Sequence, residues 1–167
     1  MMLTIVNRQR ARKINVRALK KITATLLAEL AGPAAILEIN LVGPLPMAKV
    51  NQAFLQHDGP TDVITFDYRE ELPGARGPAE PHRKSRRPED RAPGALHGEL
   101  FICPEVAVAQ SREFGTDWRA ELVRYVIHGL LHLLGHDDRE PAARRRMKRV
   151  ESRLLRDIGR RFALSKL

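Results

Sequence analysis

The sequence predicts an α+β fold: a single mixed β-sheet of three or four strands packed with about five helices, and a metal site on a central helix. The chain has 167 residues, 43% of them apolar, which suits one domain with a substantial core. Short segments of alternating apolar residues are interspersed with segments of helical period. Two histidines four residues apart interrupt a long apolar stretch, residues 122–134. We therefore expect residues 1–167 to form one metalloenzyme domain.

The N-terminal part alternates between predicted strands and helices. Leu3–Asn7 is predicted as a short strand, and Asn15 is placed to cap a helix that ends at Gly32-Pro33. The apolar positions of this helix are Val16, Leu19, Ile22, Leu26 and Leu30. Residues 36–42 alternate as a strand does, residues 47–54 suggest a short helix, and residues 62–68 are a strand rich in β-branched and aromatic residues.

The segment 70–95 has the composition of a loop. It contains five prolines and three glycines, with charges of both signs and almost no large apolar side chain. We predict a long, exposed and mobile loop here. The strand before it, 62–68, and a strand predicted at 99–102 could then pair antiparallel.

Three helices are predicted in the C-terminal part. Pro104 suits the first turn of a helix that runs to about Phe114, and Asp117 can cap a helix from Trp118 to Leu134. The last helix begins near Pro141. Its apolar stripe is Met147, Val150, Leu154, Ile158 and Phe162.

The formal net charge of +9 is concentrated at the two ends of the chain. Residues 139–167 hold eleven Lys/Arg against three Asp/Glu, and residues 1–28 hold seven Lys/Arg and no acid. Such a distribution suits a polyanionic partner. We predict that the solvent-exposed face of the last helix binds RNA through Arg145, Arg149, Arg153 and Arg156.

The cysteine content and the length of the apolar segments indicate where in the cell the protein acts. The lone Cys103 excludes an internal disulfide framework and suits a reducing cytoplasm. No apolar segment has the ~18–20 residues of a membrane span. We therefore expect a cytoplasmic protein with no membrane partner, and the sequence predicts no oligomeric state.

The clearest chemical signal lies between His128 and Asp138. His128 and His132 are four apart, so a helix places them on one face, one turn from each other. Gly135 can end that helix in a left-handed conformation, which lets the chain turn back and bring Asp138 to the same metal. Three N and O ligands with a fourth position open are typical of catalytic zinc. We predict one Zn²⁺ per chain.

These residues resemble the signature of the YbeY family, bacterial zinc-dependent endoribonucleases of ribosomal RNA maturation. The family pattern is roughly H-G-x-L-H-L-x-G-Y-D-H, and residues 128–138 read HGLLHLLGHDD. Two further segments are similar to family motifs, PTDVITF at residues 60–66 and GELFICPEVA at residues 98–107. The three matches occur in family order.

The chain departs from that pattern at three positions. Asp138 replaces the usual third histidine, Leu55 stands where many members have an arginine, and Glu99 replaces an aspartate. His136 is an alternative third metal ligand or a partner of a ligand. The general base is left open among His136, Asp137, Glu99 and a metal-bound water.

Two functions follow from the resemblance. The first is a single-strand-specific, zinc-dependent endoribonuclease that acts in ribosomal RNA processing, with ribosomal RNA and the small ribosomal subunit as partners. The alternative is a non-catalytic ribosome-assembly factor with a structural metal. A zincin-type protease is disfavoured, because Gly129 stands where that mechanism needs a glutamate base.

Overall fold

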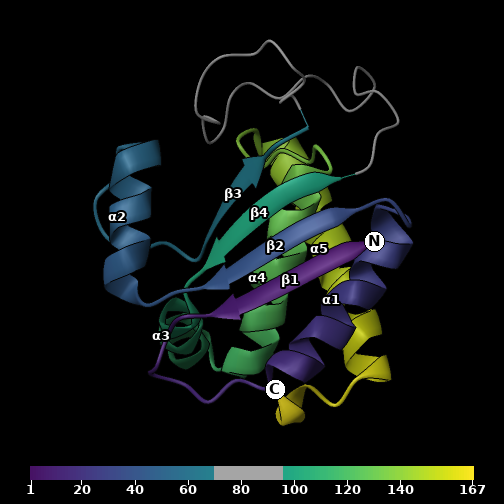
Figure 1. The fold of residues 1–167 in the computed structure, drawn as a ribbon, viewed down its shortest axis with the longest axis horizontal. Coiled ribbons are helices and arrows are strands. Elements are labelled where there is room, and N and C mark those ends of the chain that lie inside the picture. The colour runs from purple at the N-terminus through teal and green to yellow at the C-terminus, as the bar shows by residue number, and fades with distance from the viewer. Residues whose placement is uncertain (70–95) are drawn as a thin grey trace.

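The computed structural model describes residues 1–69 and 96–167 (Figure 1). It confirms a four-stranded mixed sheet with five α-helices. The strands are β1 (Met2–Asn7), β2 (Ile36–Leu41), β3 (Val63–Asp67) and β4 (His97–Ile102). The helices are α1 (Val16–Leu30), α2 (Pro44–Leu55), α3 (Pro104–Phe114), α4 (Trp118–Leu133) and α5 (Pro141–Arg161), followed by a 3₁₀ turn (Leu164–Lys166). The loop predicted over 70–95 lies outside the described residues.

The order of strands across the sheet is β1-β2-β4-β3. The first three are parallel, and β3 runs antiparallel to β4 at one edge, as the sequence predicted for this pair. Since β2 and β4 are neighbours, Leu37 lies opposite Gly98 and Ile39 opposite Leu100. Leu37, Ile39 and Leu41 alternate along β2 and are all buried, which confirms the predicted inner face.

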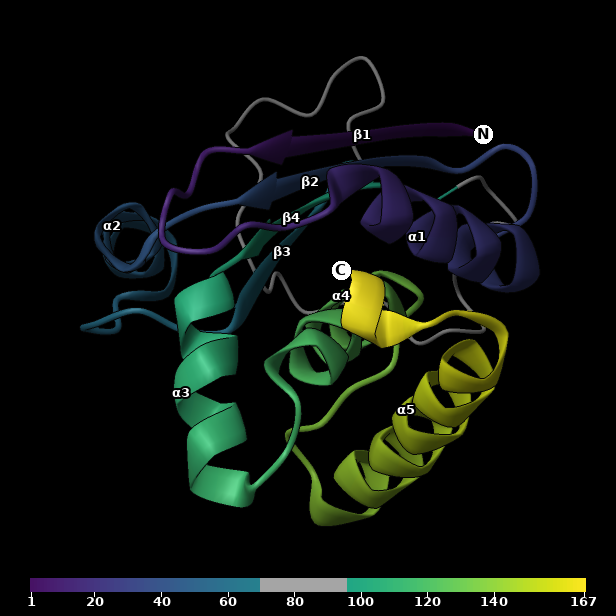
Figure 2. The ribbon, with the colours of Figure 1, turned by 90° about the horizontal axis from the view of Figure 1, so that it is seen from below.

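One face of the sheet is covered by α1, α3, α4 and α5, with α4 in the middle of them (Figure 2). Most residues of α4 are buried, because the sheet, α3 and α5 surround it. Gly129 allows the closest approach. A Cβ atom there would lie 2.7 Å from Leu100 Cδ2 and 3.2 Å from Val63 Cγ2, closer than side chains pack.

The other face of the sheet carries a smaller apolar cluster beneath α2. Ile64 and Phe66 of β3 point to this face and pack with Met47 of α2. The ring of Phe54 meets the ring of Phe66 edge-on, with centroids 5.0 Å apart. α2 is therefore fixed to the edge of the sheet that carries β3.

Several predicted boundaries were wrong by a few residues. α2 begins at Pro44 and not at Met47, because Pro44 occupies a first-turn position where its missing N–H costs nothing. β4 begins at His97 and not at Glu99, because pairing with β2 extends it. The caps of α1 and α4 were predicted correctly: Asn15 accepts from Ala18 N–H and Asp117 from Arg119 N–H.

Candidate metal centre

A half-buried polar stripe runs along α4 in the midst of buried residues. Arg124, His128 and His132 follow one another at intervals of four, and the residues between them are buried. α4 ends at Leu133, and Gly135 takes a φ of +97°, the left-handed value predicted from the sequence. The turn is held by His136 N–H, which donates to Leu131 O at 2.9 Å. It returns the chain toward the two histidines.

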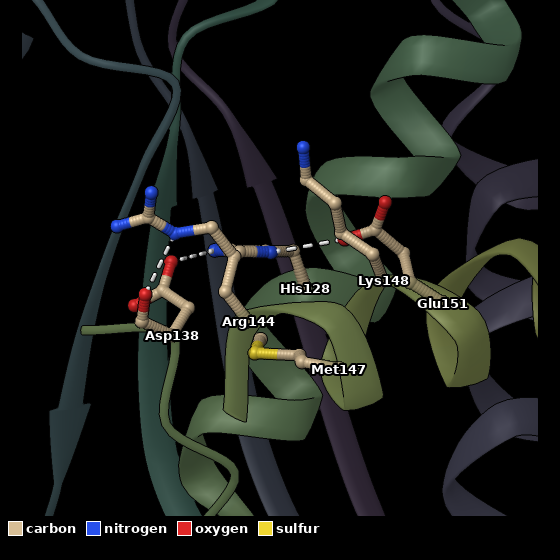
Figure 3. Close-up of a pocket in the computed structure, with 6 residues that line it drawn as sticks. All are labelled: His128, Asp138, Arg144, Met147, Lys148 and Glu151. Atoms are coloured by element: carbon tan, nitrogen blue, oxygen red, sulfur yellow. Dashed lines mark hydrogen bonds and ion pairs between the residues drawn. The ribbon is translucent and has the colours of Figure 1, made fainter. Parts of the chain in front are cut away.

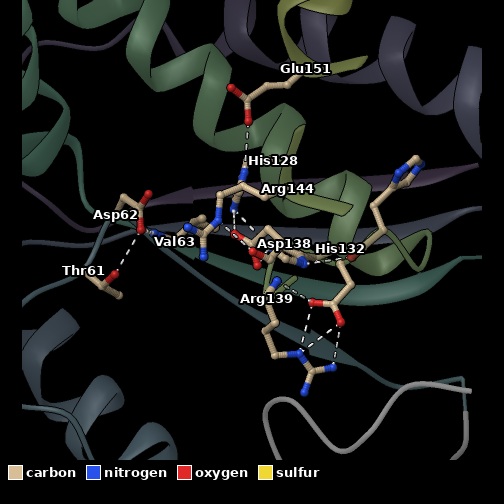
Figure 4. Close-up of polar contacts among 11 residues, drawn as sticks. Thr61, Asp62, Val63, His128, His132, Asp138, Arg139, Arg144 and Glu151 are labelled. Atoms are coloured by element: carbon tan, nitrogen blue, oxygen red, sulfur yellow. Dashed lines mark hydrogen bonds and ion pairs between the residues drawn. The ribbon is translucent and has the colours of Figure 1, made fainter. Parts of the chain in front are cut away.

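This turn brings Asp138 to the two histidines (Figure 4). The Nε2 atoms of His128 and His132 are 3.0 Å apart. One carboxylate oxygen of Asp138 lies 3.9 Å from His128 Nε2, and the other lies 3.9 Å from His132 Nε2. Of the His, Cys, Asp and Glu side chains in the described residues, only these three form a group of three or more that could hold one metal ion.

The outer nitrogens of both imidazoles are held by oxygen acceptors. His128 Nδ1 lies 3.0 Å from Glu151 Oε2, and His132 Nδ1 lies 3.1 Å from the carbonyl oxygen of His136. With the proton of each ring on Nδ1, the lone pairs of the two Nε2 atoms face each other. Two lone pairs at 3.0 Å repel unless a proton or a cation lies between them. The three residues thus fit a metal ion, with Nε2 of both histidines and the Asp138 carboxylate as ligands.

Glu151, which the sequence analysis missed, links α5 to this cluster. Its Oε2 meets His128, and its Oε1 accepts from Arg124 Nη1 at 2.9 Å. Arg124 Nε donates in turn to Glu121 Oε2 at 3.1 Å. Glu121 and Glu151 are both buried. A buried carboxylate is costly unless it is paired, so the hydrogen bonds to Arg124 and His128 offset the loss of hydration. The signal was present in the sequence: Glu151 is an acid on the apolar face of α5, between Met147 and Leu154.

The electrostatics of this chain of contacts keep Glu151 ionised. Burial acts to raise the pKa of Glu151, but hydrogen bonds from His128 and Arg124 outweigh burial and lower it. Burial acts to lower the pKa of His128, but the hydrogen bond and charge of Glu151, with the charges of Asp62 and Asp138, raise it. Asp62 is placed at the start of β3, where its Oδ1 accepts from Val63 N–H at 2.8 Å.

The other predicted candidates lie outside the metal-capable group. The His136 side chain is exposed, and this residue meets His132 through its backbone carbonyl. Asp137 pairs with Arg139 at 3.0 Å, which lowers the pKa of Asp137. Glu99 alternates with Leu100 along β4, and Leu100 is the residue that meets α4. Glu99 therefore points to the opposite face of the sheet.

On that opposite face Glu99 belongs to a separate polar group. It accepts from Asn40 Nδ2 at 2.7 Å and from the Tyr68 hydroxyl at 2.6 Å. Glu99, one of the open candidates for the general base, is therefore separated from the metal-capable group by the sheet. Leu55, one of the positions at which the sequence analysis found a departure from the family pattern, is half-buried and packs against the cluster that contains Met47.

A hollow opens beside the metal-capable group (Figure 3). Its volume is about 300 Å³. Six side chains line it: His128, Asp138, Arg144, Met147, Lys148 and Glu151. His128 and Asp138 of the metal-capable group are thus accessible from this hollow.

A sequence profile described as "Endoribonuclease YbeY" matches residues 4–159 of this chain. The chain belongs to the YbeY family. Curated YbeY endoribonucleases include that of Corynebacterium efficiens, 37% identical over 126 residues, which are 75% of this chain and 58% of the relative. That of Chlorobium phaeovibrioides is 32% identical over 141 residues, 84% of this chain and 80% of the relative. The matched regions span only 58% and 62% of the length of the first two relatives, the second being that of Salinibacter ruber.

A similar fold is seen in a solved structure. The solution structure of TM1509 from Thermotoga maritima superposes with a TM-score of 0.59 at 23% identity. It covers 94% of this chain and 89% of its own. This likeness supports the fold. Within the described residues, no helix combines the length and the apolar character needed to cross a membrane.

Proposed function

We propose that this YbeY family member is a zinc-dependent endoribonuclease that cleaves single-stranded segments of ribosomal RNA during maturation of the small ribosomal subunit. One observation carries the proposal: the His128, His132 and Asp138 ligand atoms converge at the edge of an open hollow. A buried metal with a closed ligand shell would instead suit a structural ion. The named activity of the curated relatives supports the same conclusion.

One zinc ion per chain is the cofactor that these residues would hold. A bound divalent ion polarises a phosphoryl oxygen and generates a nucleophile from water near neutral pH. His128 and His132 hold its position, because both side chains project from one rigid helix and their Nδ1–H groups are tied to acceptors. Asp138 adds negative charge to the ligand set.

The chain itself has to supply RNA binding and the transfer of protons. Arg145, Arg149, Arg153 and Arg156 are all exposed on α5, and none forms an ion pair with a carboxylate in the parts of the chain that the structure describes. They are our candidate surface for the RNA backbone. Of the three side chains that are candidates for the base, His136 is retained, because Asp137 is tied to Arg139 and Glu99 lies across the sheet.

The test is cleavage of a 5′-labelled single-stranded ribosomal RNA fragment by zinc-loaded protein, with His132→Ala as the matched control. We expect zinc-dependent internal cleavage by the wild type and none by the variant. Elemental analysis should find about one zinc per chain in the wild type and much less in His128→Ala. Tight RNA binding without cleavage, at full zinc occupancy, would favour the alternative of a non-catalytic ribosome-assembly factor.

A further inference from the structure

The hollow beside the metal-capable cluster is lined by two cations that the sequence analysis did not select. Arg144 and Lys148 are four residues apart near the start of α5, so both lie on the face that carries Met147 and Glu151. The arginines of the predicted RNA surface, beginning with Arg145, are absent from this lining. Figure 3 shows Arg144 and Lys148 on the same side as His128 and Asp138.

Arg144 is held in place and still has donors to offer. Its Nε donates to the backbone carbonyl of Asp138 at 2.8 Å, which ties the guanidinium to the rim of the hollow. Four of its five N–H donors belong to the two terminal amino groups. Within residues 1–69 and 96–167 these terminal groups make no hydrogen bond, and Lys148 forms no ion pair there.

The carboxylates of the hollow do not neutralise these two cations by direct contact. Glu151 uses one oxygen for Arg124 and the other for His128. Asp138 turns its carboxylate toward the two histidines, and Arg144 meets only its backbone. Once a divalent cation is bound, positive charge is in excess around the hollow, and an anion is the ligand that balances it.

We propose that Arg144 and Lys148 form the binding site for one phosphodiester group of the RNA strand, directly beside the metal. The planar guanidinium presents paired donors to two phosphate oxygens, and the lysine adds a compact charge from one turn further along the helix. This inference rests on the proposed function, because the function supplies the RNA substrate. It goes further by assigning the residues that hold the phosphate next to the reacting position.

The test measures binding of a minimal phosphodiester to the zinc-loaded full chain. The probe is diuridine monophosphate with 2′-O-methyl groups, which has a single phosphate and therefore reports on one phosphate site. Affinity is measured by NMR titration for the wild type and for Arg144→Gln/Lys148→Gln. The control is Arg17→Gln/Lys21→Gln, which removes the same two residue types at the same spacing from exposed positions of α1, outside the hollow.

We expect the Arg144→Gln/Lys148→Gln pair to weaken dinucleotide binding about tenfold or more, since hydrogen bonds to charged groups are lost. The control pair should change it by less than about twofold, because exposed charges at a distance are screened. Equal losses in both pairs, or no loss in the first, would overturn the proposal. Inorganic phosphate serves as a second probe. Tighter pair-dependent binding of inorganic phosphate than of the dinucleotide would overturn the phosphodiester assignment.

Cleavage of single-stranded RNA by the wild type is measured separately, so that the two proposals can fail independently. Dinucleotide binding that depends on Arg144 and Lys148, without cleavage, would retain this site and reject the nuclease. If the wild type cleaves RNA, and the Arg144→Gln/Lys148→Gln variant binds the dinucleotide as tightly as the wild type does, the nuclease proposal is retained and the proposed phosphate site is rejected. Zinc content and thermal unfolding are compared for all variants. If the Arg144→Gln substitution causes loss of zinc, the single variant Lys148→Gln is used in place of the double variant.

Discussion

Replacement of Glu151 by glutamine should weaken zinc binding although Glu151 is not itself a ligand. Both oxygens of Glu151 accept hydrogen bonds, from Arg124 at 2.9 Å and from His128 at 3.0 Å. An amide of the same shape has one accepting oxygen and one donating nitrogen. It can therefore satisfy only one of these two neighbours.

Arg124 is a permanent cation, so the oxygen of the introduced amide should turn toward it. The amide N–H₂ group then faces His128 Nδ1 and selects the tautomer with the proton on Nε2, the atom that points to His132. That proton has to move before Nε2 can bind a metal. Loss of such a supporting partner typically costs about 10- to 100-fold in metal affinity, and each factor of ten is about 1.4 kcal/mol.

The assay is competition for zinc against a chromophoric chelator, with urea unfolding of the metal-free protein measured in parallel. Glu121→Gln is the matched control, because Glu121 is similarly buried and bonds to Arg124 without meeting His128. Both variants should lose stability, since each removes a buried charge from the same chain of contacts. Only Glu151→Gln should lose zinc affinity by about tenfold or more. Equal zinc affinities in the two variants would refute this reasoning.

Three further predictions concern packing, protonation and access. Gly129→Ala should destabilise the fold by about 1–3 kcal/mol in urea unfolding, because the new Cβ meets Leu100 Cδ2 at 2.7 Å; an unchanged midpoint would contradict the close approach of α4. The raised pKa of His128 means that its charged pair with Glu151 stabilises the metal-free fold fully below pH 6.5. This stabilisation is lost as pH rises through that raised pKa, so the free energy of unfolding should fall there, and His128→Gln should flatten the profile. Burial raises the pKa of the Cys103 thiol and leaves it unexposed, so iodoacetamide should label it only in unfolded protein; rapid labelling of native protein at pH 8 would contradict its burial.

The sequence alone could predict those features that depend on neighbours along the chain. The histidine spacing, the caps at Asn15 and Asp117 and the left-handed Gly135 are local, and the structure has each of them. The convergence of Asp138 with the two histidines also followed, because one glycine turn connects them over six residues. The alternation in β2 likewise identified its buried face.

Only the tertiary structure could decide which groups from distant parts of the chain meet. Glu151 is 23 residues from His128 on another helix, and contact between them depends on how α5 packs against α4. The same packing selects Arg144 and Lys148, and not their neighbour Arg145, as the cations beside the metal-capable cluster. The sequence could not separate Glu99 from the other candidates for the general base, because strand register decides which face of a sheet a side chain occupies. Local conformational propensity depends on residues that are close together in the sequence. Helix packing and strand pairing depend on contacts between residues that are far apart in the sequence.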